Sequence, residues 1–317
     1  MSPRTSICSA VDDRGVRALV SPRLIVVQGA TASGKSELAL QLAEALGAEI
    51  IGADSRQVVE GMVIGTAAPS VDEKARIPHH MIGCWKPGDE VSAGRWLRTV
   101  EDLLEGRPDQ PFVVVGGTAL WVRLLLQGAI SVEPIPAEIR AEVAALDETT
   151  LREQLKKVDP QAFASIHPND RYRLERALGH FKASGKALGA KRAEHDWGEP
   201  RYPSVRLALM PPRDWLHDRI ECRAAAMFGE GLVEEAVGLR ARYGKVRPLD
   251  AIGYRQALAV ADGTLDEGTA IALTARDTRR YARNQETWLR KEPVTAITVT
   301  DGEGRLERAQ EILQAAS

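Results

Sequence analysis

The sequence predicts an α/β fold, in which a mostly parallel sheet is flanked by helices and the chain carries an all-helical insertion. Short apolar runs typical of buried parallel strands alternate with segments of helical periodicity on both sides of residues 131–200. Within 131–200 the strand signals stop, and only helical periodicity broken by prolines continues. We therefore expect a core built from 23–130 and 201–317, with the insertion at 131–200.

Composition restricts the class of protein. The chain has 317 residues, 44% hydrophobic and 27% charged, which is ordinary for a globular protein. Its net charge of −2 means that any nucleic-acid surface must be a local patch. Three scattered cysteines without a C-x-x-C pair argue against disulfides or zinc and suit the cytoplasm. Residues 1–22 have no apolar stretch and are expected to be a disordered leader, and no membrane span is expected.

The first predicted strand runs into the pattern G-x-x-x-x-G-K-[ST], which an apolar-periodic helix follows. In this setting the loop N–H groups surround a phosphate chain, Lys35 adds a positive charge, and the Ser36 hydroxyl holds Mg²⁺. The core is therefore predicted to be a P-loop core with Ser36 as metal ligand. The predicted diphosphate-binding residues of the loop are Gly29, Ala30, Thr31, Ala32, Ser33, Gly34, Lys35 and Ser36.

The second predicted strand, 48–53, ends at Asp54. Ligands of open α/β sheets lie beyond the carboxyl ends of the strands, so Asp54 is expected to face the phosphate loop. Its spacing leaves three roles open, namely general base, ligand of metal-bound water, and N-cap of the next turn. Residues 61–95 follow as an irregular covering region with one helix near 71–76, in which the adjacent pair His79 and His80 is expected to be structural.

The next predicted strand, 111–115, ends in two glycines and Thr118, where a motor-type NTPase carries a metal-binding Asp. This ending favours a diphosphate held for group transfer over ATP held for mechanical hydrolysis. Thr118 either touches leaving oxygens or caps the helix at 119–127.

After a strand at 205–210, Arg219 and Arg223 lie one turn apart on a helix. They can hold a diphosphate or pair with surface acids.

Two basic segments indicate a nucleic-acid surface. Residues 167–192 carry seven Lys/Arg and two acids, and residues 276–291 carry six and two. A solvated charged face explains either helix alone. Two such helices with Tyr172, Tyr254 and Trp288 nearby favour RNA. A last strand is predicted at 294–299 and a closing helix at 305–315.

Eight short motifs occur in order along residues 24–291: GATASGKS at 29–36, DSRQ at 54–57, GMVIGTAAP at 61–69, PHH at 78–80, GGT at 116–118, HPND at 167–170, GYR at 253–255 and QETW at 285–288. Together they resemble the signatures of the bacterial tRNA dimethylallyltransferases. The resemblance implies transfer of the dimethylallyl group of dimethylallyl diphosphate to the exocyclic N6 amine of an adenosine in tRNA, assisted by Mg²⁺. The implied target lies next to the anticodon on its 3′ side, in tRNAs that read codons beginning with U.

The resemblance also implies roles for individual residues. Asp54 resembles the family's general base and adenine ligand, and Thr118 and Arg219 resemble its groups on the bridging and diphosphate oxygens, with Arg223 in support and Lys35 meeting the leaving charge. The insertion is implied to bind the anticodon stem-loop. The implied tRNA contacts are Asp54, Ser55, Arg56, Gln57, Thr118, Arg140, Tyr172, Arg173, Arg176, Gly253, Tyr254, Arg255, Arg279, Arg283, Gln285 and Thr287.

Five positions depart from the family pattern, none of them assigned to chemistry: Val59, Val63, Ala68, Gly83 and Asn284. No Cys/His zinc-finger extension follows Ala316, and in this respect the sequence resembles the bacterial rather than the eukaryotic members of the family. Three other functions stay open. The first is a small-molecule kinase, which would leave the basic insertion unexplained. The second is an adenylate isopentenyltransferase, which accepts a free nucleotide and would not need the paired basic helices. The third is a non-catalytic RNA-binding protein, which would not need the intact phosphate loop together with Asp54. We expect a cytoplasmic monomer without an obligate protein partner.

Overall fold

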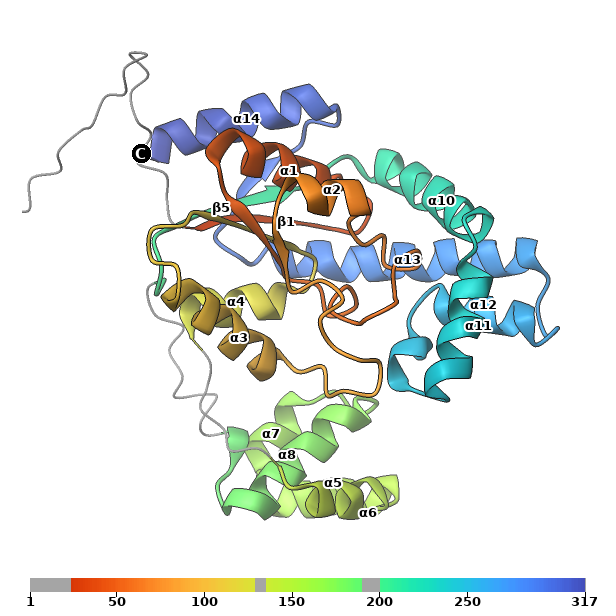
Figure 1. The fold of residues 1–317 in the computed structure, drawn as a ribbon. Helices are drawn as coiled ribbons and strands as arrows, with labels where there is room; N and C mark the ends of the chain where they lie inside the picture. Colours follow the sequence, from red (N-terminus) through yellow and green to blue (C-terminus); the bar gives the residue numbers. More distant parts are fainter. Residues whose placement is uncertain (1–23, 129–134, 190–199, 317) are drawn as a thin grey trace, which may run out of the picture. The chain divides into compact units, whose positions relative to one another are not determined.

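The computed structural model describes residues 24–128, 135–189 and 200–316, which fall into two compact units (Figure 1). One unit comprises the chain up to Leu126 and from Pro200 onward, and the other spans Gln127–Glu199. The predicted leader 1–22 lies outside the described residues. Among the helices of the described residues, none is both long and apolar enough to cross a membrane.

The first unit contains a six-stranded, all-parallel sheet in the order β3-β2-β4-β1-β5-β6. β1 lies in the sheet between β4 and β5, and the chain connects strands on both sides of it. In such sheets, ligands bind beyond the carboxyl end of the strand at which the strand order reverses, which here is β1. The five predicted strands are confirmed. β3 was not predicted and lies in the region expected to be irregular. A strand of two residues is too short to give a sequence pattern. The strands are β1 (Leu24–Gly29), β2 (Glu49–Gly52), β3 (His79–His80), β4 (Phe112–Gly116), β5 (Ser204–Leu209) and β6 (Thr295–Ile297).

Alternate residues of the strands fill two separate cores, one on each face of the sheet. Leu24 and Val26 pack against α3 and α4, whereas Ile25 and Val27 pack against α1 and α14. Figure 1 shows these two helix pairs on opposite faces. Their bounds are α1 (Lys35–Leu46), α3 (Ala93–Glu105), α4 (Ala119–Gln127) and α14 (Gly302–Ala316).

Three tryptophans fix the end of β2. The Trp96 indole, fully buried, donates its Nε1–H to the Gly52 carbonyl oxygen at 2.8 Å. It stacks on Trp121 with ring centroids 5.1 Å apart, and Trp121 meets Trp85 edge-on. These packed rings hold the end of β2 in place, and Asp54 follows Gly52 by two positions.

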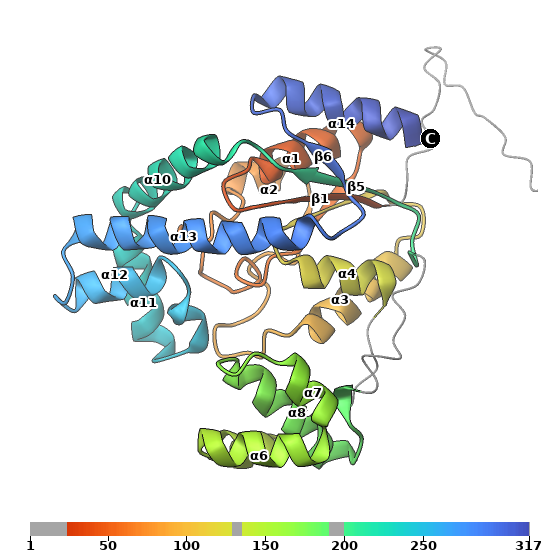
Figure 2. The same cartoon turned by 180° about the vertical axis from the view of Figure 1, so that it is seen from behind.

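The remaining helices of this unit surround the loop after β1. The methyl groups of Ala30 and Ala32 pack against Leu216, Ile220 and Ala282, so that α10 and α13 cover the loop. Figure 2 shows the long α13 in full. The elements are α2 (Val71–Arg76), α10 (Arg213–Gly229), α11 (Leu232–Tyr243), the 3₁₀ turn η1 (Arg247–Asp250), α12 (Tyr254–Ala261) and α13 (Glu267–Leu289).

In the described part of the second unit, four helices pack around Leu151, Leu155 and Leu174. The Asp159 carboxylate is 1% exposed; one oxygen caps α7 at the Ala162 N–H (2.9 Å) and the other accepts the Gly189 N–H (2.8 Å). These charge-assisted bonds tie the end of the unit to its middle. The helices are α5 (Ala137–Ala144), α6 (Glu148–Val158), α7 (Pro160–Ser165) and α8 (Arg171–Ser184).

Candidate active site

The predicted phosphate loop joins β1 to α1. Ala32 and Gly34 have positive φ angles of 65° and 91°, and Lys35 begins the helix. The first N–H groups of a helix have no intrahelical acceptor and, with the helix dipole, favour an anion. The Lys35 ammonium donates to the Ala30 carbonyl oxygen at 3.3 Å across the loop. The motif therefore folds as a cradle for phosphate oxygens.

Three consecutive loop residues are each held by a residue from a distant helix. The Gln285 Oε1 of α13 accepts the Thr31 N–H at 2.9 Å. The Arg219 Nε of α10 donates to the Ala32 carbonyl at 3.0 Å. The Arg305 Nη1 of α14 donates to the Ser33 carbonyl at 3.1 Å. Because each contact spans more than 180 positions, no local pattern in the sequence reveals the set.

The ends of β2 and β4 are joined beside this loop. Thr118 donates its N–H to the Ala53 carbonyl at 3.2 Å, and its Oγ1 accepts the Ser55 N–H at 3.1 Å. Gly116 lies so close to the Ala53 backbone, and Gly117 to the Gln285 amide, that neither has room for a Cβ. The double glycine thus lets two strand ends and α13 meet, and it places Thr118 beside Asp54.

Asp54 caps the turn that follows it. Its Oδ1 accepts the N–H groups of Arg56 at 2.8 Å and Gln57 at 3.5 Å, so the capping role is present. Oδ2 accepts no hydrogen bond from the described residues, and one oxygen is left for a ligand. Capping and proton acceptance therefore use different atoms of the same carboxylate.

The charges of Asp54, Lys35 and Arg223 act on one another. Burial lowers the pKa of Lys35 to about 8; the charge of Asp54 raises this pKa, and that of Arg223 lowers it further. Burial also lowers the pKa of Arg223, again with Asp54 raising it and Arg219 lowering it. Lys35 and Arg223 thus interact with the Asp54 carboxylate, and Arg219 adds a further positive charge near Arg223. This excess of positive charge favours an anionic ligand.

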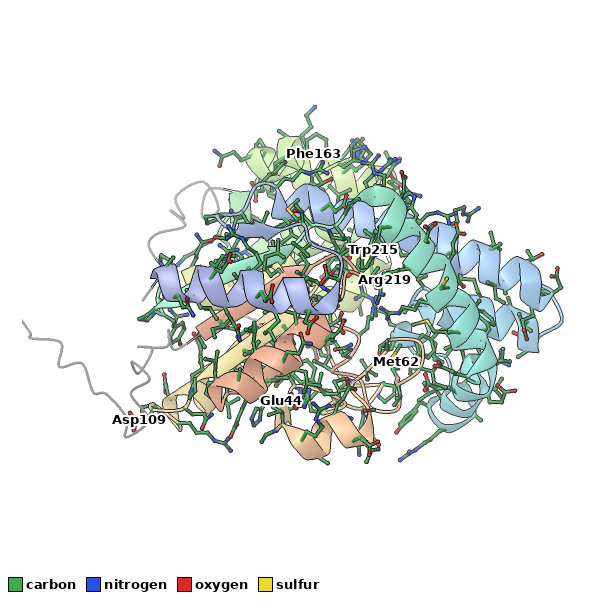
Figure 3. All side chains as sticks on the ribbon, turned by 90° about the horizontal axis from the view of Figure 1, so that it is seen from above. Glu44, Met62, Asp109, Phe163, Trp215 and Arg219 are labelled. Carbon is green, nitrogen blue, oxygen red and sulfur yellow. The ribbon has the colours of Figure 1, made fainter. Side chains whose placement is uncertain are left out.

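The two arginines of α10 differ in setting. Arg223 donates to the Thr31 hydroxyl at 3.2 Å and to the Thr66 carbonyl at 3.3 Å. Arg219 is exposed, and its guanidinium lies 4.8 Å from the centre of the Trp215 ring. Figure 3 labels Arg219 and Trp215 on α10. Arg219 and Arg223 therefore contact the phosphate loop, and neither forms an ion pair with a surface acid among the described residues.

A cavity of about 320 Å³ lies within the first unit, beside the phosphate loop. The residues that line it include the polar side chains of Thr31, Asp54 and Arg223. Its volume is at the lower end of the range of ligand pockets, roughly 300 to 1,000 Å³. The apolar lining residues are Ile220, Ala224, Met227, Ala251 and Ile252. A ligand with an anionic head and a short apolar tail matches this mixture of polar and apolar lining residues.

Tyr281 lines the same cavity and was not predicted. The residue is 40% exposed. Partial burial raises the pKa of its hydroxyl to about 12, with Asp54 adding to the rise and Arg56 opposing it. It thus stands near Asp54 as a neutral aromatic group. The only signal available in the sequence is its position in the basic segment 276–291.

Two of the side chains predicted to contact RNA are buried in the structure. Tyr254 is fully buried, and its hydroxyl donates to Glu235 at 2.5 Å. Gln285 is 7% exposed, and its two amide atoms bind Thr31 and the Gly117 carbonyl. Both side chains therefore support the site from inside. Gly253, with a φ of 91°, is also buried and is the N-cap residue that precedes α12.

The other predicted RNA contacts lie at or near the surface. In the first unit Arg56, Arg255, Arg283 and Thr287 are exposed, and Ser55, Gln57 and Arg279 are half-buried. Several of them have protein partners. Arg255 pairs with Asp277 at 2.6 Å, Arg279 pairs with Glu221 at 2.5 Å, Gln57 donates to the Thr66 and Ala67 carbonyls, and the Thr287 hydroxyl donates to the Arg283 carbonyl.

In the second unit, Arg140, Tyr172, Arg173 and Arg176 are exposed. Arg173 pairs with Asp170 at 3.2 Å, an exposed pair that adds little stability. Arg173 and Arg176 therefore lie on the exposed side of α8, as predicted, while Leu174 and Leu178 point inward.

The family model described as IPP transferase matches residues 57–292, and one described as isopentenyl transferase matches residues 22–78. The chain belongs to the IPP transferase family. Its relatives include the tRNA dimethylallyltransferase of Phenylobacterium zucineum, 41% identical over 302 residues that cover 90% of this chain and 96% of the relative. The tRNA dimethylallyltransferase of Anaeromyxobacter dehalogenans is 43% identical over 278 residues that cover 85% and 92%.

Solved structures agree with this family assignment. The tRNA delta(2)-isopentenylpyrophosphate transferase of Staphylococcus epidermidis is 29% identical, with a TM-score of 0.67 over 92% of this chain and 99% of that one. A eukaryotic dimethylallyltransferase acting on tRNA, 24% identical, shares the fold, with a TM-score of 0.79 over 90% of this chain and 77% of that one. The predicted family and the predicted fold class are therefore confirmed.

Two departures from the IPP transferase pattern have a structural setting. Val59 is buried and forms a bridge with Trp85, so an apolar side chain suits the position. Gly83 has a φ of 59°, a conformation that glycine adopts without strain. Val63 and Asn284 are exposed, and nothing in the structure explains Ala68.

Proposed function

We propose that the chain transfers the dimethylallyl group of dimethylallyl diphosphate to the N6 amine of an adenosine in tRNA and releases diphosphate. One observation carries the proposal: Thr31 of the phosphate loop, Arg223 and Asp54 line the same cavity. The names of the relatives support the reaction. We further propose the adenosine on the 3′ side of the anticodon, in tRNAs reading codons that begin with U, as its target.

The diphosphate is proposed to lie in the loop, against Lys35, Arg219 and Arg223. Mutual repulsion and burial disfavour these charges in the free protein, as the lowered pKa values of Lys35 and Arg223 indicate. A diphosphate relieves that cost, and the charge that develops on it as the allylic C–O bond breaks is met by groups already in place.

The prenyl chain is proposed to lie along Ile220, Ala224 and Met227, which form an apolar wall of the cavity beside Arg223. Contact with this wall removes apolar surface from water. It also keeps water from the allylic carbon, where hydrolysis would compete with transfer.

The acceptor amine is proposed to face Asp54. As the C–N bond forms and the C–O bond breaks, the amine loses a proton to Oδ2, the oxygen that the turn does not use. The Thr118 hydroxyl accepts the Ser55 N–H, so its own hydrogen is available to an oxygen of the departing diphosphate.

Magnesium fits the residues present. Among the described residues no cluster of three or more His, Cys, Asp or Glu could hold a metal ion. Mg²⁺ commonly keeps several waters and binds substrate phosphates with few protein ligands, and Ser36 is exposed at the start of α1. We propose that the Ser36 hydroxyl is its protein ligand. When bound, Mg²⁺ neutralises charge on the diphosphate.

Exposed cationic and aromatic residues are proposed to bind the tRNA. They lie on both units of a chain whose net charge is −2, so the basic segments form local patches. A base in the anticodon loop can leave its stack at modest cost to enter a pocket. The exposed residues proposed for this surface are Arg56, Arg140, Tyr172, Arg173, Arg176, Arg255, Arg283 and Thr287, with Arg279 beside them. We propose a monomer that acts in the cytoplasm.

The test is incubation of the protein with dimethylallyl diphosphate, Mg²⁺, AMP, ATP and unmodified tRNA, followed by nucleoside analysis. We expect prenylated adenosine in the tRNA while ATP is not consumed. A tRNA with guanosine on the 3′ side of its anticodon is the matched control and should gain no prenyl group. Prenylated AMP, or ATP consumption coupled to a small metabolite, would overturn the proposal.

A further inference from the structure

Arg305 is a buried cation at the base of the phosphate loop. It is 4% exposed, although it belongs to α14, the last helix of the chain. Its three donor nitrogens are all used: Nε on the Asp301 carbonyl at 3.0 Å, Nη1 on the Ser33 carbonyl at 3.1 Å, and Nη2 on the Glu37 carboxylate at 2.9 Å. Two of these three contacts lie on the loop and the first turn of the helix that follows it.

The contacts fix the peptide between Ser33 and Gly34. Its carbonyl accepts from Arg305, and its N–H therefore points away from the guanidinium. A Cβ on Gly34 would collide with that guanidinium, so the glycine is required by Arg305 as well as by its φ of 91°. Hydrogen bonds also polarise one another, so a cation on the carbonyl makes the N–H of the same peptide a stronger donor.

The charge of Arg305 is only partly neutralised. The side chain of Glu37 is 54% exposed, so water screens its half of the ion pair, while the Arg305 side chain is 5% exposed. A buried guanidinium is costly unless its partners repay the loss of water. An anion bound on the other side of the Ser33–Gly34 peptide provides such a partner.

We propose that Arg305 is a positioning residue of the diphosphate site, which holds the Ser33–Gly34 N–H toward the diphosphate and adds positive charge beneath it. The last helix then belongs to the binding site and is not only a cover for the sheet. This inference rests on the proposed assignment of the loop to dimethylallyl diphosphate.

The test compares Arg305→Met with Arg308→Met on the full chain. Arg308 lies on the same helix and is exposed, with an ion pair to Glu311, so it controls for loss of charge on α14. We expect Arg305→Met to weaken pyrophosphate binding and to raise the KM for dimethylallyl diphosphate about tenfold, with the KM for tRNA within about twofold of wild type. Arg305→Lys should fall between, and Arg308→Met should match wild type.

Two further variants separate the possible failures. Glu37→Gln removes the counterion but leaves the Arg305 contact with Ser33, so pyrophosphate binding should hold or tighten. Lys35→Ala tests the loop assignment itself: if it leaves pyrophosphate binding unchanged, the proposed function fails. If Lys35→Ala weakens binding and folded Arg305→Met does not, only the inference about Arg305 fails. Should Arg305→Met not fold, wild-type pyrophosphate affinity in Arg305→Lys overturns the proposal.

Discussion

Lys35 is a buried ammonium whose charge is unfavourable until an anion arrives. Burial lowers its pKa from the ordinary 10.5 to about 8. Below pH 8 the charge is present in both the folded and the unfolded chain and opposes folding. Between pH 8 and 10.5 the unfolded chain binds more protons, so this contribution to stability rises with pH. We therefore predict that Lys35→Met raises the Tm of the ligand-free protein at pH 7 and that the gain fades by pH 10.5, as followed by thermal unfolding.

The same pKa predicts how ligand binding depends on pH. In the proposed site, charged Lys35 binds the diphosphate, so above pH 8 the free protein must take up a proton before it binds. Pyrophosphate affinity should therefore fall by up to tenfold per pH unit above 8, measured by calorimetry. Lys35→Met should bind weakly at every pH and lose this dependence. A wild-type affinity that stays constant from pH 7 to 9.5 would contradict the prediction.

Asp54 is predicted to separate catalysis from folding. In Asp54→Asn the amide oxygen still caps the turn through Arg56 and Gln57, because Asn caps about as well as Asp. Loss of the proton acceptor should lower kcat by roughly 10²- to 10⁴-fold. Single-turnover assays should show this loss with the Tm and the KM for dimethylallyl diphosphate little changed. Asp54→Ala serves as the comparison that also loses the cap, and wild-type turnover in Asp54→Asn would exclude Asp54 as the base.

The residues predictable from sequence are those whose role is local. Gly34, Lys35 and Ser36 act through a strand–loop–helix signal contained in about a dozen positions. Gln285 and Arg305 act on the same loop from 254 and 272 positions away, so no spacing rule points to them. The burial of Tyr254 could not be predicted from its neighbours in the sequence. An aromatic beside a basic residue suggests RNA, whereas burial against Glu235 depends on a helix elsewhere in the chain.

At the scale of elements, apolar runs and helix caps were sufficient for most of the core. The helix predicted at 119–127 is α4, and the one predicted near 71–76 is α2, which begins with a Ser70 capping box. The sequence could not show which helices cover which end of the sheet. The packing of α10 and α13 on the phosphate loop depends on small side chains, Ala30, Ala32 and Ala282, whose periodicity carries no distinct signal.

Asp159 is predicted to hold the helical unit together. Each carboxylate oxygen accepts one N–H, from Ala162 and Gly189, inside a buried setting. Asp159→Asn places an NH₂ group against one of these donors and should destabilise the unit by about 1 to 3 kcal/mol. Hydrogen exchange of α6 to α8 should report the loss, while pyrophosphate binding stays unchanged.

The matched control for that prediction is Asp147, an N-cap in the same unit. It is exposed and accepts the Thr150 N–H at 2.9 Å. Asp147→Asn should change stability by less than about 0.5 kcal/mol, because Asn is an equivalent cap and water satisfies the rest. Equal effects of the two substitutions would show that burial of Asp159 is unimportant.

At the scale of the whole molecule, the chain leaves and re-enters the first unit at a single point. The Arg201 N–H donates to the Leu126 carbonyl at 2.6 Å, so the two ends of the helical unit are already adjacent. Replacing 128–199 with a short Gly/Ser linker closes a small loop at little entropic cost. We predict that the shortened protein folds and binds pyrophosphate within about twofold of wild type, since the loop, the arginines and the cavity all belong to the first unit.

The same shortened protein should lose prenyl transfer to tRNA by at least about 10³-fold, because it lacks the exposed cations of α8. The full-length double variant Arg173→Glu and Arg176→Glu is the comparison, since both side chains are exposed on a helix that stays folded. It should raise the KM for tRNA, most strongly at low salt, and leave the KM for dimethylallyl diphosphate unchanged. Full tRNA activity in the shortened protein would mean that the first unit alone selects the RNA, and the helical unit would then need another role.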